Sequence, residues 1–139
     1  MKTLTIIQPW ATLVVSGRKK NETRSWKTNY RGEILIHAGR KRIDYAEEIF
    51  MNPYFIEAGI ARRKILDLMP RGLIIGKANL VDCIRIDEKY QEEIKNTNPS
   101  EFAFGDYSIG RYAWVMENPI IFEEHIPASG KQGLWNWEL

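Results

Sequence analysis

The stretch Gly17-Arg18-Lys19-Lys20-Asn21-Glu22-Thr23-Arg24-Ser25-Trp26 carries more information than any other part of this sequence of 139 residues. Its second half, residues 22–26, alternates in character and contains Thr, Ser and Trp, which favours a β-strand. Because a strand turns every second side chain to the same face, Glu22, Arg24 and Trp26 should share one face, and Lys19 in the preceding turn should reach it. We therefore expect a carboxylate, a guanidinium, an ammonium and an aromatic ring within one small area.

Two interpretations of this group of side chains stay open from the residues alone. Such groups can hydrogen-bond a base edge, hold a phosphate and stack on a ring, as in sites that bind RNA or nucleotides. They can also form a salt-bridged strand, with Trp26 packed in the core. In the first case Lys19→Ala should leave folding nearly intact, because a long side chain in a polar turn buries little apolar surface, while binding should weaken.

The sequence on either side of this stretch predicts short strands with helices inserted between them. Pro9 can begin a helix that Gly17 ends, and Gly76 marks a bend in the longest strand-like segment. Further strands are expected at 4–7, 33–38, 72–86, 111–117, 120–124 and 134–139, helices at 44–50, 55–68 and 87–95, and a loop at 96–107. The pattern predicts an α+β fold built on a small, mostly antiparallel β-barrel with inserted helices.

Length and composition favour one domain over residues 1–139. Cys83 is the sole cysteine, so no internal disulfide can form, and we expect a reducing compartment, the cytoplasm. The apolar start is interrupted by Gln8-Pro9, and no apolar run approaches the ~20 residues that cross a bilayer, so we expect neither a signal peptide nor a membrane segment. His37, His125 and Cys83 are not at metal-ligand spacing, so we expect no metal and no cofactor.

The net charge of +2 hides an uneven distribution along the chain. Residues 1–77 hold 15 Lys and Arg against 7 Asp and Glu, whereas residues 78–139 hold 5 against 11. The basic excess is densest in residues 17–42, where an anionic partner could bind. A solvated face that the acidic half neutralises in space would give the same pattern, so charge alone leaves both explanations open.

Several motifs resemble the ASCH domain family, whose fold is PUA-like. The family signature Gly-x-Lys-x-x-Glu-x-Arg is present as Gly17, Lys19, Glu22 and Arg24. Further similarity, in the order of the family, lies in Gln8-Pro9-Trp10-Ala11, Tyr30-Arg31-Gly32, Ile36-His37-Ala38, Tyr112-Ala113-Trp114-Val115 and Gly130-Lys131-Gln132-Gly133-Leu134-Trp135. The resemblance covers nearly the whole chain and implies a PUA-like β-barrel.

The resemblance also implies a groove beside the barrel that binds RNA or modified nucleosides. We expect Lys19, Glu22 and Arg24 to line it and Trp26 to stack on a base, with Tyr30, His37 and Lys131 nearby. Family members have RNA-binding, ribonuclease or N4-acetylcytidine amidohydrolase roles, so function has to be argued from the site.

Two enzymatic alternatives and a third, non-enzymatic one accompany this expectation. A ribonuclease would use Glu22 or Lys19 as the base and Arg24 as an electrostatic clamp, with the hydroxyl of Tyr30 or Tyr107 assisting. An amidohydrolase would use Lys19, but Glu22 occupies the place of the nucleophilic threonine, Thr23 should face the other way, and the glutamate would have to be Glu92 or Glu93. A protein-interaction module would leave the groove empty. We expect RNA or nucleoside binding, with catalysis by Lys19 and Glu22 left open.

Overall fold

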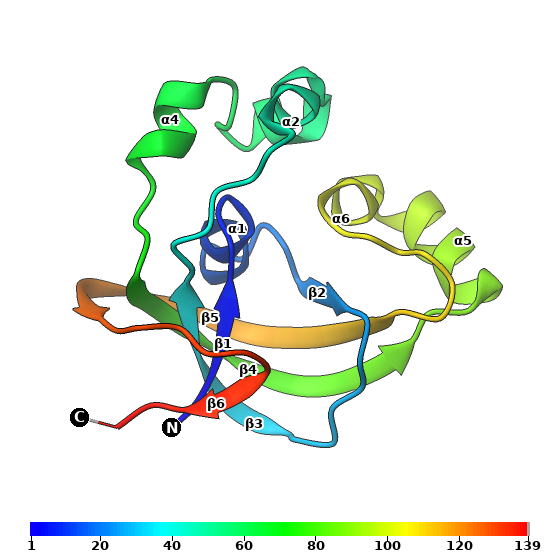
Figure 1. Ribbon diagram of the computed structural model, residues 1–139. Coiled ribbons are helices and arrows are strands. Elements are labelled where there is room, and N and C mark those ends of the chain that lie inside the picture. The colour runs from blue at the N-terminus through cyan, green and yellow to red at the C-terminus, as the bar shows by residue number, and fades with distance from the viewer. Residues whose placement is uncertain (139) are drawn as a thin grey trace.

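A curled six-stranded sheet forms the base of the molecule, and the helices lie above it (Figure 1). The computed structural model describes residues 1–138, and the order of strands in the sheet is β2-β5-β4-β3-β1-β6. The strands are β1 (Lys2–Ile6), β2 (Asn21–Arg24), β3 (Gly32–Ala38), β4 (Leu73–Arg85), β5 (Tyr112–Pro127) and β6 (Leu134–Asn136). Neighbouring strands pair antiparallel, except that β1 and β3 run parallel. The expected α+β fold, a small, mostly antiparallel β-barrel with inserted helices, is confirmed, and the six strands form a curled half-barrel.

The two long strands β4 and β5 give the sheet its curl, because their pairing shifts register three times. One shift falls between Ile74 and Gly76, as the bend predicted at Gly76 requires. A side chain at Gly76 would begin 2.2 Å from the carbonyl oxygen of Ile120 and 2.8 Å from Val15, so only glycine fits there. The lack of a side chain at Gly76 therefore lets β4 bend and lie close to both β5 and the first helix.

Several boundaries differ from the sequence-based expectation. The strands expected at 111–117 and 120–124 form one strand, β5, which passes through the positive φ of Asn118 and pairs with β4 on both sides of it. The helix expected over 55–68 is two helices, because Gly59 adopts a φ of +88° between them. The last strand ends at Asn136, and Leu139, included in the expected strand, lies outside the described residues.

The six helices of residues 1–138 are short. They are α1 (Trp10–Val15), α2 (Ala46–Met51), α3 (Pro53–Glu57), α4 (Arg63–Leu68), α5 (Glu88–Thr97) and α6 (Pro99–Phe104). The loop expected over 96–107 contains α6, whose start has a recognisable signal: Asn98 caps the helix by accepting from the backbone N–H of Glu101, and Pro99 takes the first helical position. No helix among residues 1–138 is long and apolar enough to cross a membrane.

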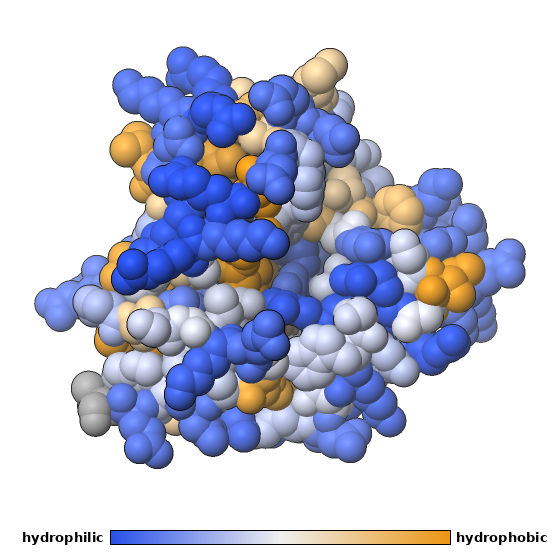
Figure 2. Space-filling model, in the orientation of Figure 1, coloured by the Kyte–Doolittle hydropathy of each residue, from blue (hydrophilic) through white to orange (hydrophobic). Residues whose placement is uncertain are grey.

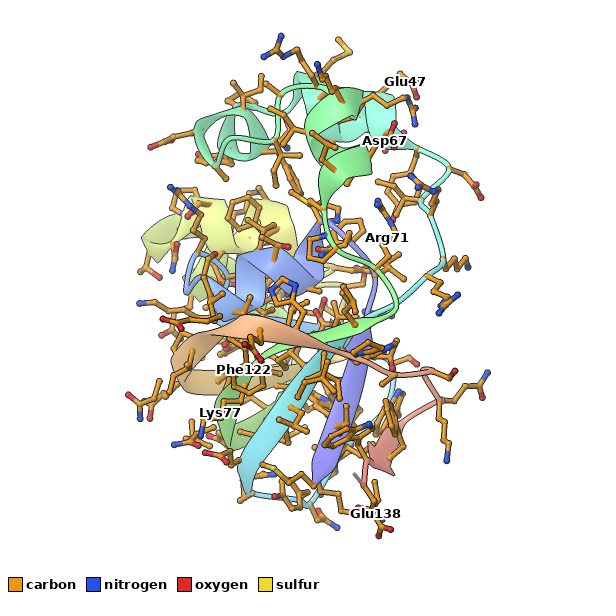
Figure 3. The ribbon with its side chains drawn as sticks, turned by 90° about the vertical axis from the view of Figure 1, so that its left-hand side faces the viewer. Glu47, Asp67, Arg71, Lys77, Phe122 and Glu138 are labelled. Atoms are coloured by element: carbon orange, nitrogen blue, oxygen red, sulfur yellow. The ribbon has the colours of Figure 1, made fainter. Side chains whose placement is uncertain are left out.

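α1 lies between two parts of the hydrophobic core. Its Val14 and Val15 pack onto the sheet with Leu4, Ile36 and Trp114, while Leu13 turns to a second cluster in the helical layer. In that layer Phe55 of α3 meets Phe104 of α6 edge to face, with ring centroids 5.0 Å apart. Figure 3 separates the two layers, with Glu47 and Asp67 among the helices and Lys77 and Phe122 on the sheet. The space between α1, the outer helices and β2 stays open as a pocket.

Candidate functional site

A cavity of about 570 Å³ opens between the helical layer and the sheet, in the hollow visible at the centre of Figure 2. Its walls come from the end of β1, α1, β2, α2, α3, α6 and the segment that leads into β5. Three charged groups of the signature line it, namely Lys19, Glu22 and Arg24. The remaining lining residues are Thr5, Ile6, Ile7, Trp10, Thr23, Lys41, Tyr45, Glu48, Ile49, Asn52, Phe55, Ala103, Phe104, Gly105, Asp106 and Arg111.

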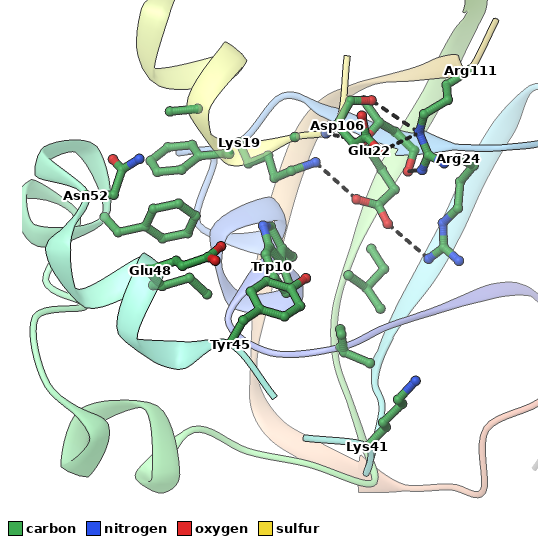
Figure 4. A pocket seen from close by; sticks show the side chains of 18 of the residues that line it. Trp10, Lys19, Glu22, Arg24, Lys41, Tyr45, Glu48, Asn52, Asp106 and Arg111 are labelled. Atoms are coloured by element: carbon green, nitrogen blue, oxygen red, sulfur yellow. Dashed lines mark hydrogen bonds and ion pairs between the residues drawn. The ribbon is translucent and has the colours of Figure 1, made fainter. Parts of the chain in front are cut away.

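Glu22 joins the other two members of the signature. Its Oε1 lies 3.0 Å from Nζ of Lys19 and its Oε2 lies 3.0 Å from Nη2 of Arg24, as the dashed lines of Figure 4 mark. The predicted geometry, Glu22 and Arg24 on one surface within reach of Lys19, is therefore confirmed. The strand β2 carries two of these side chains, and the turn after α1 delivers the third.

The structure corrects the expected exposure of Lys19. The side chain is buried, with 2% of the residue exposed, and Nζ donates both to Glu22 and to the backbone carbonyl of Asn21. Lys19 therefore holds the turn and β2 together, and the premise that its side chain buries little surface is wrong.

Arg24 is the member of the signature that remains available to a ligand. Its Nη2 donates to the carbonyl of Thr5 at 2.7 Å and pairs with Glu22, so the guanidinium is fixed from two sides. Its Nε is shielded from solvent and has no hydrogen-bond partner among residues 1–138. The side chain keeps 24% of its surface exposed, toward the pocket that it lines. A planar, pre-oriented guanidinium of this kind suits a carboxylate, a phosphate or a base edge.

The electrostatics of the pocket keep Glu22 ionised. Burial by itself raises the pKa of Glu22, but the charges and hydrogen bonds of Lys19 and Arg24 outweigh it, so the pKa lies below its ordinary value. Lys19 and Glu22 thus neutralise each other, and Arg24 contributes the excess positive charge. A carboxylate with a lowered pKa is a weak base, which makes Glu22 a poor general base for attack by a ribose hydroxyl.

Trp26 and Tyr30 are not brought to this pocket. β2 ends at Arg24, so the alternation does not continue to Trp26, which instead meets Trp114 edge to face with ring centroids 4.6 Å apart. The Trp26 carbonyl also accepts from Nε1 of Trp114 at 3.2 Å. The hydroxyl of Tyr30 donates to the carbonyl of Glu33 at 2.8 Å. Both side chains pack against the core of the sheet.

His37 lies behind the pocket rather than in it. Its Nδ1 lies 3.1 Å from Oγ1 of Thr5, and its Nε2 lies 2.7 Å from the carbonyl of Ala128. Because Nε1 of Trp135 also donates to Oγ1 of Thr5, at 3.0 Å, the Thr5 hydroxyl can give its own proton to Nδ1, and Nε2–H then donates to Ala128. This neutral tautomer agrees with the lowered pKa of His37, for which burial is the main cause.

Lys131, Tyr107, Glu92 and Glu93 also lie outside the pocket, whereas Thr23 is among its lining residues. Lys131 sits over the ring of Trp135, with Nζ 6.0 Å from the centroid. The hydroxyl of Tyr107 binds the side chain of Asn21, and Glu92 and Glu93 are exposed on α5. The hydroxyl of Thr23 accepts from the backbone N–H of Asp106 at 3.0 Å, away from Lys19. The arrangement expected of a threonine nucleophile is not assembled here.

Sequence reasoning missed the opposite wall of the pocket, which Tyr45, Glu48 and Asn52 form on α2 and at the start of α3. Figure 4 shows these side chains across the cavity from Lys19 and Arg24, with Trp10 between the two walls. Their position depends on long-range packing of the helical layer, which no local pattern encodes. No group of three or more His, Cys, Asp or Glu side chains within residues 1–138 is arranged to hold a metal ion.

Comparison with known proteins places the chain in a family. The family model for the ASCH domain matches residues 4–125. The chain belongs to the ASCH domain family. Over 135 residues it is 27% identical to Activating signal cointegrator 1 of Mus musculus and, equally, to that of Homo sapiens. These matches cover 95% of this chain but only 21% of either relative, so the chain spans about a fifth of the length of the curated proteins it matches.

Solved structures support the same fold. A crystal structure of ASCH from Zymomonas mobilis superimposes with a TM-score of 0.55 at 17% identity and covers 91% of this chain and 72% of that one. A mutant form of the Zymomonas mobilis protein superimposes with a TM-score of 0.54, again at 17% identity, and covers 91% of this chain and 74% of its own. At this identity the likeness concerns the ASCH fold alone.

Proposed function

We propose that the pocket bounded by Lys19, Glu22 and Arg24 binds RNA or a free nucleoside or nucleotide. The observation that carries the proposal is Arg24, a guanidinium fixed by Glu22 and Thr5 that lines the pocket and keeps 24% of its side-chain surface exposed. A guanidinium held for stability alone would be expected to use its donors within the fold. One that keeps part of its surface exposed beside an open cavity is suited to an incoming acceptor.

The size and lining of the pocket support a nucleotide in particular. A cavity of about 570 Å³ lies within the usual range for small-molecule sites. Trp10, between the two walls, and Tyr45, on the wall at α2, provide aromatic surface on which a base can stack. Lys41 also lines the pocket and adds positive charge that suits a phosphate, whereas Arg111 is paired with Asp106 at 3.4 Å. The ASCH family is generally associated with RNA, which agrees with this chemistry.

The geometry of the pocket fits ligand binding better than catalysis. The lowered pKa of Glu22 makes it a weak base, and Tyr30 and Tyr107 use their hydroxyls elsewhere. We therefore assign Lys19 and Glu22 the role of positioning Arg24 and β2, and we assign contact with the ligand to Arg24.

The test is affinity for a short single-stranded RNA and for nucleoside monophosphates, measured by calorimetry on wild type, Arg24→Ala and Arg18→Ala. Arg18 is a matched control because it is exposed in the same basic segment and does not line the pocket. Arg24→Ala removes a charged hydrogen bond worth ~1.5–3 kcal/mol, so this variant should bind the ligand about tenfold to a hundredfold more weakly than wild type. The affinity of Arg18→Ala should stay close to that of wild type.

Two further readings separate the ligands. RNA affinity should fall steeply as salt is added, because phosphate contacts release counterions, whereas affinity for an uncharged nucleoside should change little. Equal loss of affinity in both variants would assign binding to general positive charge, and folded wild-type protein that binds none of these ligands would overturn the proposal.

A further inference from the structure

The wall formed by α2 and α3 presents a donor and an acceptor to the pocket. Asn52 caps α3: its Oδ1 accepts from the backbone N–H of Tyr54 at 2.9 Å. That bond fixes the orientation of the side-chain amide, so its NH₂ group remains free to donate. Since Asn52 lines the cavity, it offers a hydrogen-bond donor of defined orientation there.

Glu48 supplies the acceptor on the same wall. It points toward the cavity from α2 in Figure 4 and lines it. Within residues 1–138 it takes part in neither a hydrogen bond nor an ion pair, whereas its neighbour Glu47 lies 3.5 Å from Arg63 on the outside of the helical layer. An ionised carboxylate can only accept, so this part of the pocket selects for a ligand group that donates.

Stacking surface adjoins this donor and acceptor. Tyr45, 49% exposed, lies beside Trp10 with ring centroids 6.3 Å apart. A flat ring held there would turn one edge toward α2 and α3, while Arg24 stands across the cavity. The pocket is thus divided into a half that suits a base and a half that suits a phosphate or sugar.

We propose that Glu48 and Asn52 read the edge of the base, and that the ASCH pocket therefore prefers bases with an exocyclic amino group (cytosine, adenine or guanine) over uracil. This inference rests on the proposed function. An amino group donates to the carboxylate of Glu48 while a neighbouring ring nitrogen or carbonyl accepts from Asn52. Uracil has no amino group, and its one ring N–H on this edge lies between two carbonyl oxygens. A carboxylate that accepts from this N–H also lies close to both oxygens, whose partial negative charges weaken the contact.

The experiment compares the affinities of CMP, AMP, GMP and UMP for wild type, Glu48→Gln and Glu47→Gln. All four ligands carry the same sugar and phosphate, so the comparison isolates the base. We expect wild type to bind at least one amino-bearing nucleotide about tenfold more tightly than UMP, as one well-placed carboxylate contact to a base amino group would give. Glu48→Gln, which can donate as well as accept, should reduce that ratio toward one, and Glu47→Gln should preserve it.

The outcomes separate this inference from the proposed function. UMP binding as tightly as the other three, or a preference that survives in Glu48→Gln, overturns the reading of the base by Glu48 while leaving an Arg24-dependent pocket in place. Absence of binding by all four nucleotides and by RNA overturns both. Melting temperatures of the three proteins should agree closely, because Glu47 and Glu48 are both exposed.

Discussion

The Nζ of Lys19 lies 3.0 Å from Oε1 of Glu22, and both side chains are almost completely withdrawn from solvent. A buried pair of this kind is an exacting arrangement, because each charge is costly to bury without the other. Arg24 then depends on Glu22 for its position. A change at Lys19 or Glu22 should therefore affect both the stability of the protein and the position of Arg24 in the pocket.

Replacing Lys19 by Met should destabilise the protein strongly. The change leaves the carboxylate of Glu22 buried with Arg24 as its one remaining cationic partner among residues 1–138, and removal of one member of a buried pair costs ~3–5 kcal/mol. Chemical denaturation measures the effect, with Lys20→Met as the control, since Lys20 is exposed and its substitution should stay within ~0.5 kcal/mol. The double variant Lys19→Met with Glu22→Gln should recover part of the loss, and no recovery would contradict the coupling.

The lowered pKa of Glu22 predicts a specific loss of stability in acid. Because the folded-state pKa lies below the ordinary 4.5, the contribution of the carboxylate is complete above about pH 4.5 and is lost as pH falls through the folded-state pKa. The free energy of unfolding of wild type should therefore exceed that of Glu22→Gln at neutral pH, and the difference should shrink as the solution is acidified. A difference that stays constant down to about pH 2 would show that the charge of Glu22 contributes nothing. Asp106 also has a lowered pKa, but it is present in both proteins and cancels.

Substitution of two aromatic residues should have opposite effects on ligand binding and on stability. Tyr45→Ala should fold normally, because the ring is half exposed, and should weaken nucleotide binding by ~1–3 kcal/mol for a lost stacking contact. Trp26→Ala should bind normally but melt earlier, since its edge-to-face contact with Trp114 alone is worth ~0.5–1.5 kcal/mol. Affinity and melting temperature measured on both variants decide the matter. Reduced affinity in a well-folded Trp26→Ala protein would restore Trp26 as a ligand contact.

His37 should reduce stability under mildly acidic conditions. Burial, together with the charge of Arg40, lowers its folded-state pKa below 6.5, although the hydrogen bond to Ala128 acts the other way. The unfolded chain thus takes up a proton first, and stability should decline as pH falls below about 6.5 until the folded-state pKa is reached. His37→Gln should flatten this part of the profile, whereas His125→Gln, at an exposed site, should keep it. Parallel profiles for all three proteins would contradict the assignment.

Local patterns predicted the parts of the molecule that local chemistry determines. The alternation of Glu22 and Arg24 and the bend at Gly76 follow from the period of a strand and from the lack of a side chain, and both are found. The stacking role of Trp26 was inferred by extending the same alternation two residues too far, past the end of β2. Glu48 and Asn52 could not be assigned from the sequence, because their approach to Arg24 depends on how the helical layer packs over α1.

Thr5 links the pocket to a strand that is synthesised much later in the chain. Its carbonyl positions Arg24, its hydroxyl joins His37 to Trp135, and the strand that carries it pairs with β6 from Lys2–Asn136 to Leu4–Leu134. While the chain is emerging from the ribosome, one edge of β1 therefore stays unpaired until residues 134–136 appear, long after the signature has left the exit tunnel. The Thr5 side of the proposed pocket therefore gains its full support only when β6 has paired with β1.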